Sequence, residues 1–231
     1  MALLEDLKRR VKGYSTQPYE INSTTIVPDT DNAGLTFGNK GLSGTFAFLF
    51  VDIRNSSTLH EKYGFANAAK IYQSFHDINV RVIEENGGSI RSFDGDRVMG
   101  VFVGTTKNSN AAKAAMEIQW AIRNILNPEL KTQITCGAGI DSGEILVAKI
   151  GKGRDKNNND LVWIGKADNY ASHLANEAKN TIIISSNAYN ILSSDRKVAS
   201  DGRQMWLKKL ITLKSGKQVI CYESSWGRVI Y

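Results

Sequence analysis

The chain alternates between short apolar runs and longer amphipathic stretches, a pattern typical of a domain that mixes strands and helices. The run at 45–52, TFAFLFVD, is almost continuously apolar and predicts a buried strand. Apolar residues spaced three and four apart over 65–85 predict an amphipathic helix. Two strands are expected at 89–94 and 97–103, because Asp-Gly between two strand-like runs is a hairpin signal.

The second half of the chain continues this alternation. It predicts helices at 109–126, 166–178 and 186–193, and strands at 133–141, 144–150, 161–164, 181–185, 204–208 and 217–223. The order β-α-β-β-α-β is that of a ferredoxin-like core. We therefore predict an α+β fold, an α/β sandwich with a ferredoxin-like βαββαβ core and additional C-terminal α/β elements.

The residues before the first buried strand have a different pattern. A short amphipathic helix begins the chain, and we expect it to pack on the domain or on a partner subunit. Its apolar stripe is Leu3, Leu4, Leu7 and Val11. Residues 14–43 are rich in Ser, Thr, Asn, Asp and Gly, which predicts a linker or an irregular arm. The predicted organisation is an N-terminal helix and arm at 1–43 and one globular domain at 44–231.

Composition narrows the possible partners and compartment. The 231 residues carry 29 basic and 23 acidic side chains, a net charge of +6. That charge suits an anionic partner, although solubility explains it equally well. Cys136 and Cys221 lie in apolar, strand-like contexts, which indicates buried free thiols. With no membrane-spanning run and no secretory signal, we expect a cytoplasmic protein.

Two carboxylates stand where strands end. Asp52 follows the buried run directly, and Asp96 lies in the hairpin turn. The first and third strands of such a core are neighbours, so the two side chains can lie together. Close carboxylates repel unless a cation joins them, and Mg²⁺ or Mn²⁺ prefers oxygen ligands. Turn formation is the preferred explanation for Asp94 and an equal alternative for Asp96, whereas it does not explain Asp52.

Four stretches resemble the motifs of class III nucleotidyl cyclases, in family order. They are FLFVDIRNSSTL, FDGDRVMGVF, CGAGIDSGEILVAKIG and VWIGKADNYASHLANEAK. The resemblance covers about 44–223 and implies the class III cyclase fold, with 44–231 as the catalytic domain. It also implies a reaction in which the ribose 3′-hydroxyl attacks the α-phosphate and pyrophosphate leaves. Asp52 and Asp96 would hold two Mg²⁺ or Mn²⁺ ions, assisted by the Ile53 carbonyl.

The resemblance also assigns residues to the triphosphate. Asn169 falls on the family's transition-state asparagine, and Lys208 or Lys209 falls where the family places a triphosphate lysine. His173 replaces the family's usual arginine, so another cation such as Arg154 is an alternative. Without the motif order, we would interpret Asn169 as a solvated helix residue. The two lysines would then be residues of an exposed edge strand, where lysine is common. The family builds its sites at a head-to-tail interface, which implies a homodimer with two equivalent sites.

The family's purine-reading residues are absent. Adenylate cyclases have Lys and guanylate cyclases Glu four residues before the second metal aspartate, where this chain has Ser92. The partner position, three residues before Gly165, is Val162, with Asp160 nearby. A missing hydrogen-bond partner discriminates strongly between bases, so ATP and GTP are poor candidates.

Two other residues suit a smaller base. Phe50 could line the base pocket or simply fill the core, and Arg97 could donate to a base carbonyl or phosphate, or be a surface strand residue. With the compact form of the chain, this resembles the pyrimidine nucleotide cyclases of bacterial Pycsar anti-phage systems. These make cyclic UMP or cyclic CMP, which acts on a separate effector. Because uracil offers carbonyl acceptors to an arginine, we expect UTP in preference to CTP.

Other interpretations stay open at this point. An adenylate or guanylate cyclase would make cyclic AMP or cyclic GMP. An inactive nucleotide-binding dimerisation module would bind without turnover, and the changes at Ser92 and His173 keep this alternative open. A GGDEF-type diguanylate cyclase shares the core, but its Gly-Gly-(Asp/Glu)-Glu-Phe hairpin is absent. An RNA-binding ferredoxin-like domain needs an aromatic motif that is also absent, so we do not expect nucleic acid as a partner. Because the sequence has no membrane-spanning run, we do not expect a membrane as a partner either.

Overall fold

The structure is a computed structural model that describes residues 2–31, 34–151, 159–213 and 216–230. It divides into two compact units. Unit 1 comprises Met1–Thr45 and Glu144–Gly165, and unit 2 comprises Phe46–Gly143 and Lys166–Tyr231. Arg154, the alternative cation considered above, lies outside the described residues.

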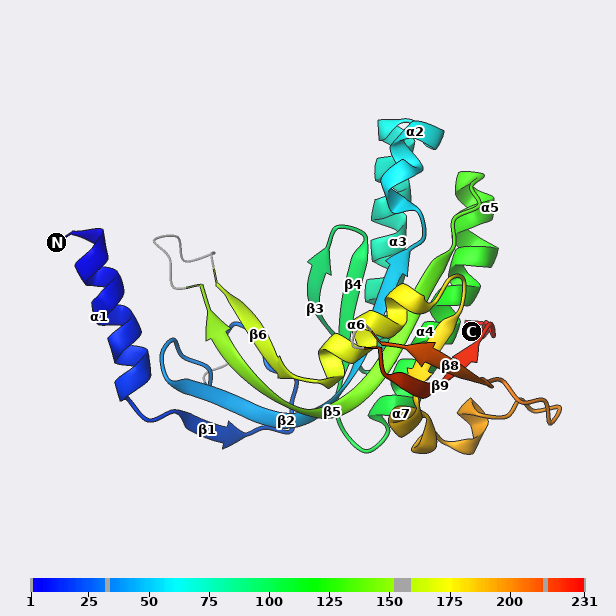
Figure 1. Cartoon of the computed structure of the whole chain (residues 1–231). Coiled ribbons are helices and arrows are strands. Elements are labelled where there is room, and N and C mark those ends of the chain that lie inside the picture. The colour runs from blue at the N-terminus through cyan, green and yellow to red at the C-terminus, as the bar shows by residue number, and fades with distance from the viewer. Residues whose placement is uncertain (1, 32–33, 152–158, 214–215, 231) are drawn as a thin grey trace. The chain divides into compact units, whose positions relative to one another are not determined.

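Helices and strands alternate along the described chain (Figure 1). The strands are β1 (Glu20–Ser23), β2 (Lys40–Ile53), β3 (Ser89–Asp94), β4 (Arg97–Phe102), β5 (Cys136–Ile150), β6 (Asp160–Gly165), β7 (Ile182–Ser185), β8 (Leu207–Thr212) and β9 (Gln218–Ser224). The α-helices are α1 (Leu3–Thr16), α2 (Leu59–Tyr63), α3 (Phe65–Glu85), α4 (Lys107–Ala121), α5 (Asn127–Leu130), α6 (Ala167–Glu177) and α7 (Ser186–Asn190).

Unit 2 contains a sheet in the order β3-β4-β2-β5-β7-β9-β8. Its first four strands, with α3 and α4, follow the chain order β-α-β-β-α-β, and the first strand, β2, lies beside the third, β4. That neighbour relation is the ferredoxin-like one, so the predicted fold class is confirmed. The strands β7, β8 and β9 and the helices α6 and α7 are the predicted C-terminal additions.

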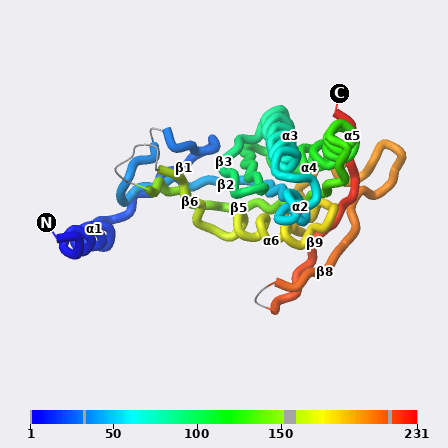
Figure 2. Tube along the Cα trace, turned by 90° about the horizontal axis from the view of Figure 1, so that it is seen from above, coloured from blue at the N-terminus to red at the C-terminus, as the bar shows by residue number. Residues whose placement is uncertain are grey.

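The two faces of this sheet are covered by different helices. Alternate side chains of β2, including Leu49 and Val51, enter the main core together with residues of α3 and α4. The other face is covered by α6, whose Leu174 packs with Ile183 of β7. Figure 2 shows α3 and α4 on one side of β2 and β5 and α6 on the other. Phe50 and Asp52 alternate with the core residues of β2 and therefore point to the α6 side.

A glycine in β5 allows α6 to lie close to the sheet. A Cβ atom on Gly139 would be 2.1 Å from the carbonyl oxygen of Ala171 and 2.2 Å from the nitrogen of Ala175. Real side chains essentially never approach backbone atoms so closely. The glycines of this stretch therefore serve helix packing, and the strand continues through them.

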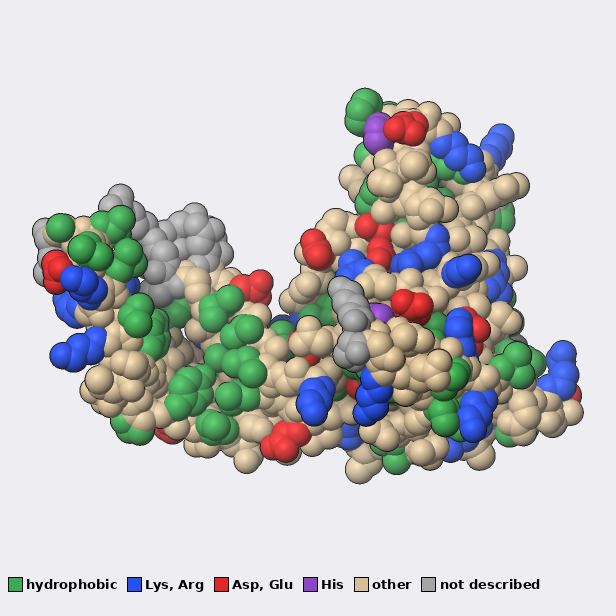
Figure 3. Space-filling view, in the orientation of Figure 1, with side chains coloured by type: hydrophobic (Ala, Val, Ile, Leu, Met, Phe, Trp, Pro, Cys, Tyr) green, Lys and Arg blue, Asp and Glu red, His purple; other side chains and the backbone are tan. Residues whose placement is uncertain are grey.

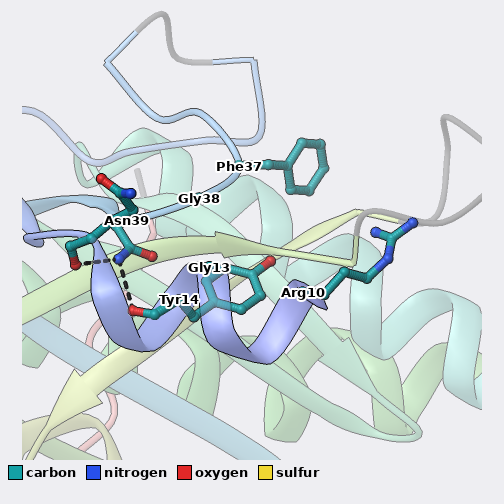
Figure 4. A pocket seen from close by; sticks show the side chains of 7 residues that line it. Arg10, Gly13, Tyr14, Phe37, Gly38 and Asn39 are labelled. Carbon is teal, nitrogen blue, oxygen red and sulfur yellow. Dashed lines mark hydrogen bonds between the residues drawn. The ribbon is translucent and has the colours of Figure 1, made fainter. Parts of the chain in front are cut away.

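Unit 1 contains α1, β1, the first part of β2, the last part of β5, and β6. β1 pairs in parallel with β2, and β6 pairs antiparallel with β5. No residue of α1 is buried, and green side chains are visible on it in Figure 3. Its exposed apolar residues are Leu3, Leu4, Leu7, Val11 and Tyr14. A cavity of about 300 Å³ lies between α1 and the segment around Phe37 (Figure 4).

Three local predictions are wrong. The strands expected at 133–141 and 144–150 form the single strand β5, because its glycines do not interrupt the ladder. The strand expected at 204–208 begins only at Leu207, since Met205 and Trp206 are buried in the main core before it. The arm at 14–43 is not wholly irregular, because it contains β1 and the first residues of β2.

The predictions for the long helix, the hairpin strands and the two thiols are confirmed. The helix at 65–85 and the hairpin strands have the predicted bounds within a residue. Cys136 and Cys221 are buried free thiols. Among the described residues, no helix combines the length and apolar character needed to cross a membrane.

Candidate active site

The two carboxylates singled out by the sequence lie side by side at one edge of the β2–β4 ladder. The antiparallel register pairs Val51 with Val98, so Asp52 and Ile53 come opposite Arg97 and Asp96. The Ile53 backbone N–H donates to Oδ2 of Asp96 over 2.9 Å. The strand end and the hairpin turn therefore meet as predicted, although they are 44 residues apart in the chain.

The carboxyl groups perturb each other. The pKa of Asp96 is raised to about 6, first by burial and then by the hydrogen bond and negative charge of Asp52. Burial also raises the pKa of Asp52, but hydrogen bonds with Asp96 and Arg97 outweigh burial and lower that pKa overall. The positive charge at this edge acts on Asp52, so Asp96 is the carboxyl group whose ionised form a cation would stabilise.

Two arginines connect this edge to α6. Arg97 Nη2 lies 2.7 Å from Oδ2 of Asp52, and Arg54 Nη2 lies 3.1 Å from the same oxygen. Arg97 also donates to Ser172 Oγ over 3.0 Å and to the side chain of Asn176. Residues 172 and 176 are one helical turn apart, so a single face of α6 meets the carboxylate edge.

The same helix carries the predicted transition-state residues. Asn169 lies in the first turn of α6 and is exposed, with its amide 3.3 Å from Oδ1 of Asp168. His173 follows one turn later and is half-buried. Its Nε2 atom is buried and has no hydrogen-bond partner among the described residues. This atom is a hydrogen-bonding group left without a partner by the described residues, which makes His173 a candidate for rotation toward a substrate group.

The predicted base-pocket residues of unit 2 form one row across three strands. Phe50 of β2 pairs with Met99 of β4, and Met99 pairs with Ser92 of β3. Cross-strand partners share a face of the sheet, so these side chains lie on the face that also carries Asp52. Phe50 and Met99 are nearly buried and Ser92 is half-buried. Val162 belongs to unit 1, where it is half-buried on β6 opposite Ala148.

The two candidate lysines occupy opposite faces of the edge strand β8. Lys209 pairs with Cys221, which packs with Leu174 of α6, so Lys209 points to the α6 side. Lys208 pairs with Tyr222, which packs against the main core on the other side. Lys209 also forms an ion pair with Glu223, 2.7 Å away.

Comparison with known proteins decides the family. The chain is 34% identical over 215 residues to a protein named uridylate cyclase from Xanthomonas perforans, covering 90% of each chain. It is 34% identical over 212 residues to a uridylate cyclase from Burkholderia cepacia, covering 89% of this chain and 91% of that one. The chain belongs to the nucleotidyl cyclase family that includes these proteins. No protein-family model matches the chain.

Solved structures agree on the fold of this cyclase. The guanylyl cyclase Cya2 superposes with a TM-score of 0.68 at 20% identity, over 83% of this chain and 96% of that one. The adenylyl cyclase CyaB of P. aeruginosa gives the same TM-score and identity, and the match covers 81% of this chain and 97% of that one. The recognised fold, the class III cyclase fold, is therefore confirmed, and the protein is a nucleotidyl cyclase.

Sequence reasoning missed several residues around the site of this cyclase. Arg54, Ser172 and Asn176 are ordinary polar residues in the sequence; Arg54 directly follows β2, and the packing of α6 brings Ser172 and Asn176 to the carboxylate edge. Met99 was assigned to a strand but not to the base pocket. The two-residue turn sets the register of β3 and β4, so it could have placed Met99 opposite Ser92.

Proposed function

We propose that this cyclase converts UTP, or less readily CTP, into the 3′,5′-cyclic monophosphate and pyrophosphate. The observation that carries the proposal is the paired Asp52 and Asp96 at an arginine-lined sheet edge. The choice of uracil is supported by relatives named uridylate cyclase, which align with about 90% of the chain.

Two Mg²⁺ or Mn²⁺ ions fit the carboxylate edge. Asp52 and Asp96 present oxygens, and the pKa of Asp96, raised by burial and by Asp52, indicates a carboxyl group whose charge a metal ion would stabilise. Ile53 would add its carbonyl oxygen. When bound, divalent ions supply charge neutralisation for the triphosphate and lower the pKa of the attacking hydroxyl. Within the described residues no group of three or more His, Cys, Asp or Glu side chains gathers, so substrate and water oxygens would complete the coordination.

The remaining residues on the α6 face are proposed to hold the triphosphate and ribose. Asn169 would orient the ribose, and His173, once rotated so that its buried Nε2 is exposed, would donate a hydrogen bond to the α-phosphate. Of the two lysines, Lys209 shares the face of α6, which favours it over Lys208 as the triphosphate contact. Transfer of a phosphoryl group depends mainly on such positioning and charge.

The base is proposed to lie against the row formed by Phe50, Met99 and Ser92. This row offers apolar surface and one hydroxyl, and it has no purine-reading Lys or Glu. Arg97 is adjacent, and turning its guanidinium away from Ser172 and Asn176 would let it donate to a uracil carbonyl. Val162 is proposed as the apolar residue at the second reading position.

We further propose a homodimer whose active sites combine the carboxylate edge of one chain with α6 of its partner. One chain carries both halves, which is the condition for two equivalent sites. The cyclic nucleotide is proposed to act on a separate effector protein in bacterial anti-phage defence, and the enzyme to work in the cytoplasm.

Incubation with UTP and Mn²⁺ tests cyclisation itself. We expect cyclic UMP and pyrophosphate in equal amounts, and at least a hundredfold less from the Asp52→Asn variant, which keeps the shape of the side chain but not its charge. If wild type and Asp52→Asn bind UTP and neither consumes it, the protein is an inactive nucleotide-binding module and the proposal is wrong.

Mixing two inactive variants tests the shared sites. Asp52→Asn removes the metal half and Asn169→Ala the ribose half. Random pairing of equal amounts gives half heterodimers, each with one intact site of two, so about a quarter of wild-type activity should return. No recovery in a mixture shown to exchange subunits would contradict sites built from two chains.

A further inference from the structure

The turn that carries Asp96 is held by few contacts of its own. The last paired residues of the hairpin are Asp94 and Arg97, so Gly95 and Asp96 form the loop between them. Gly95 has a φ of +61°, a conformation that glycine adopts without strain. On the β2 side, Asp96 is fixed by the Ile53 backbone N–H. The loop would otherwise depend on this side alone for its position.

A histidine on α3 holds the opposite side of the turn. Nε2 of His76 lies 3.0 Å from the carbonyl oxygen of Gly95. A carbonyl oxygen only accepts hydrogen bonds, so Nε2 is the donor and carries the hydrogen. The Gly95 carbonyl belongs to the peptide group that leads into Asp96. This bond therefore fixes the plane of the peptide from which Asp96 projects.

Aromatic neighbours and burial fix the orientation of this ring. Phe93 of β3 meets it at 90° with ring centroids 5.2 Å apart, and Phe75 meets it at 73° and 5.8 Å. Both are edge-to-face arrangements, which aromatic pairs prefer. Nδ1 of His76 is buried without a hydrogen-bond partner among the described residues. The ring thus forms one directed hydrogen bond, to the turn, while its Nδ1 atom is buried and the residue as a whole is half-buried.

We propose that His76 is a positioning residue that holds Asp96 in place for divalent-metal binding. Bending of the hairpin at its two-residue loop would move the turn away from β2 and displace Asp96 from Asp52. The hydrogen bond from α3 resists that movement. His76 touches neither the substrate nor the metal in this role. The inference rests on the proposed metal site, because it concerns the geometry of one of its ligands.

Two variants of similar size separate the hydrogen bond from the packing. His76→Gln keeps an N–H donor, whereas His76→Met fills the same space without one. His60 provides a matched control. It lies on the separate helix α2 and stacks on Phe65 at the start of α3, with ring centroids 5.3 Å apart. The His60→Met variant removes a surface histidine without touching the hairpin.

Mn²⁺ affinity measured by electron paramagnetic resonance is the readout. The probe is Mn²⁺ with the 3′-deoxy analogue of the triphosphate that the wild type cyclises, so binding is seen without turnover. We expect the dissociation constant of Mn²⁺ to rise about tenfold in His76→Met, since residues that orient metal ligands have effects of this size. It should stay within about threefold of wild type in His76→Gln and unchanged in His60→Met.

Equal Mn²⁺ affinity of His76→Met and wild type would overturn the inference, as would equal losses in the Met and Gln variants. Asp52→Asn distinguishes this failure from that of the proposed function. If Asp52→Asn abolishes Mn²⁺ binding and His76→Met does not change it, the metal site stands and only the role of His76 is wrong. If Asp52→Asn binds Mn²⁺ as the wild type does, the proposed metal site itself is wrong.

Discussion

Replacing Gly139 by alanine should displace α6 and reduce catalysis more than stability. The new Cβ would lie 2.1 Å from the Ala171 carbonyl oxygen, whereas ordinary contact begins at 3.4 Å. The helix must therefore move by about 1.3 Å, because the opposing atoms are backbone. Overpacking of this kind lowers the free energy of unfolding by about 1–3 kcal/mol. A shift of about 1 Å in a positioning element can lower the rate by about a hundredfold.

Gly143→Ala, in the same strand, is the matched control for this variant. Its Cβ would meet only the Cβ of Ala167 at 3.3 Å, which a shift of a few tenths of an ångström relieves. Urea unfolding and steady-state UTP turnover should be measured for both variants. For Gly143→Ala we expect a free energy of unfolding within about 1 kcal/mol of the wild type and a turnover rate within about threefold of it. If Gly139→Ala matches the wild type in both measurements, α6 is not seated on Gly139 and the reasoning is wrong.

Two further predictions concern buried charge and the triphosphate. Burial raises the pKa of Asp141 to about 6, above its ordinary 3.8, although a hydrogen bond from Ser185 opposes the rise. The folded state therefore binds the Asp141 proton more tightly than the unfolded state does. The contribution of this proton to the free energy of unfolding is fully present below about pH 4. As pH rises through 6, about 3 kcal/mol of unfolding free energy should be lost, and Asp141→Asn should lack this dependence in urea unfolding across pH 4–7. Lys209→Ala should raise the KM for UTP about tenfold and Lys208→Ala less than twofold in steady-state kinetics; the reverse order would assign the triphosphate contact to Lys208.

The strands of the core could be predicted because their patterns are local. The apolar run that ends at Asp52 and the Asp-Gly turn before Asp96 each identify a strand end, and topology then brings the two together. The single strand β5 could not be predicted in the same way. Gly139 and Gly143 are typical strand breakers in a sequence, and only the close approach of α6 explains Gly139.

Contacts between distant elements explain what the sequence left out of the site. Asn176 reaches Arg97 across 79 residues, and Ser172 reaches it across 75. Neither has a local pattern that differs from a solvated helix face. His76 is similar, since its hydrogen bond to Gly95 depends on how α3 crosses the hairpin. Such contacts follow from helix packing angles, which hydrophobic periodicity does not determine.

A competition among the four ribonucleoside triphosphates tests the central claim most directly. The protein is incubated with equal concentrations of UTP, CTP, ATP and GTP in the presence of Mn²⁺, and the cyclic products are quantified by mass spectrometry during initial turnover. The ratio of products gives the ratio of kcat/KM values. We expect 3′,5′-cyclic UMP to dominate, with cyclic CMP second and purine products at least a hundredfold lower. Predominance of cyclic AMP or cyclic GMP would contradict the account of Ser92, Val162 and the Phe50 row.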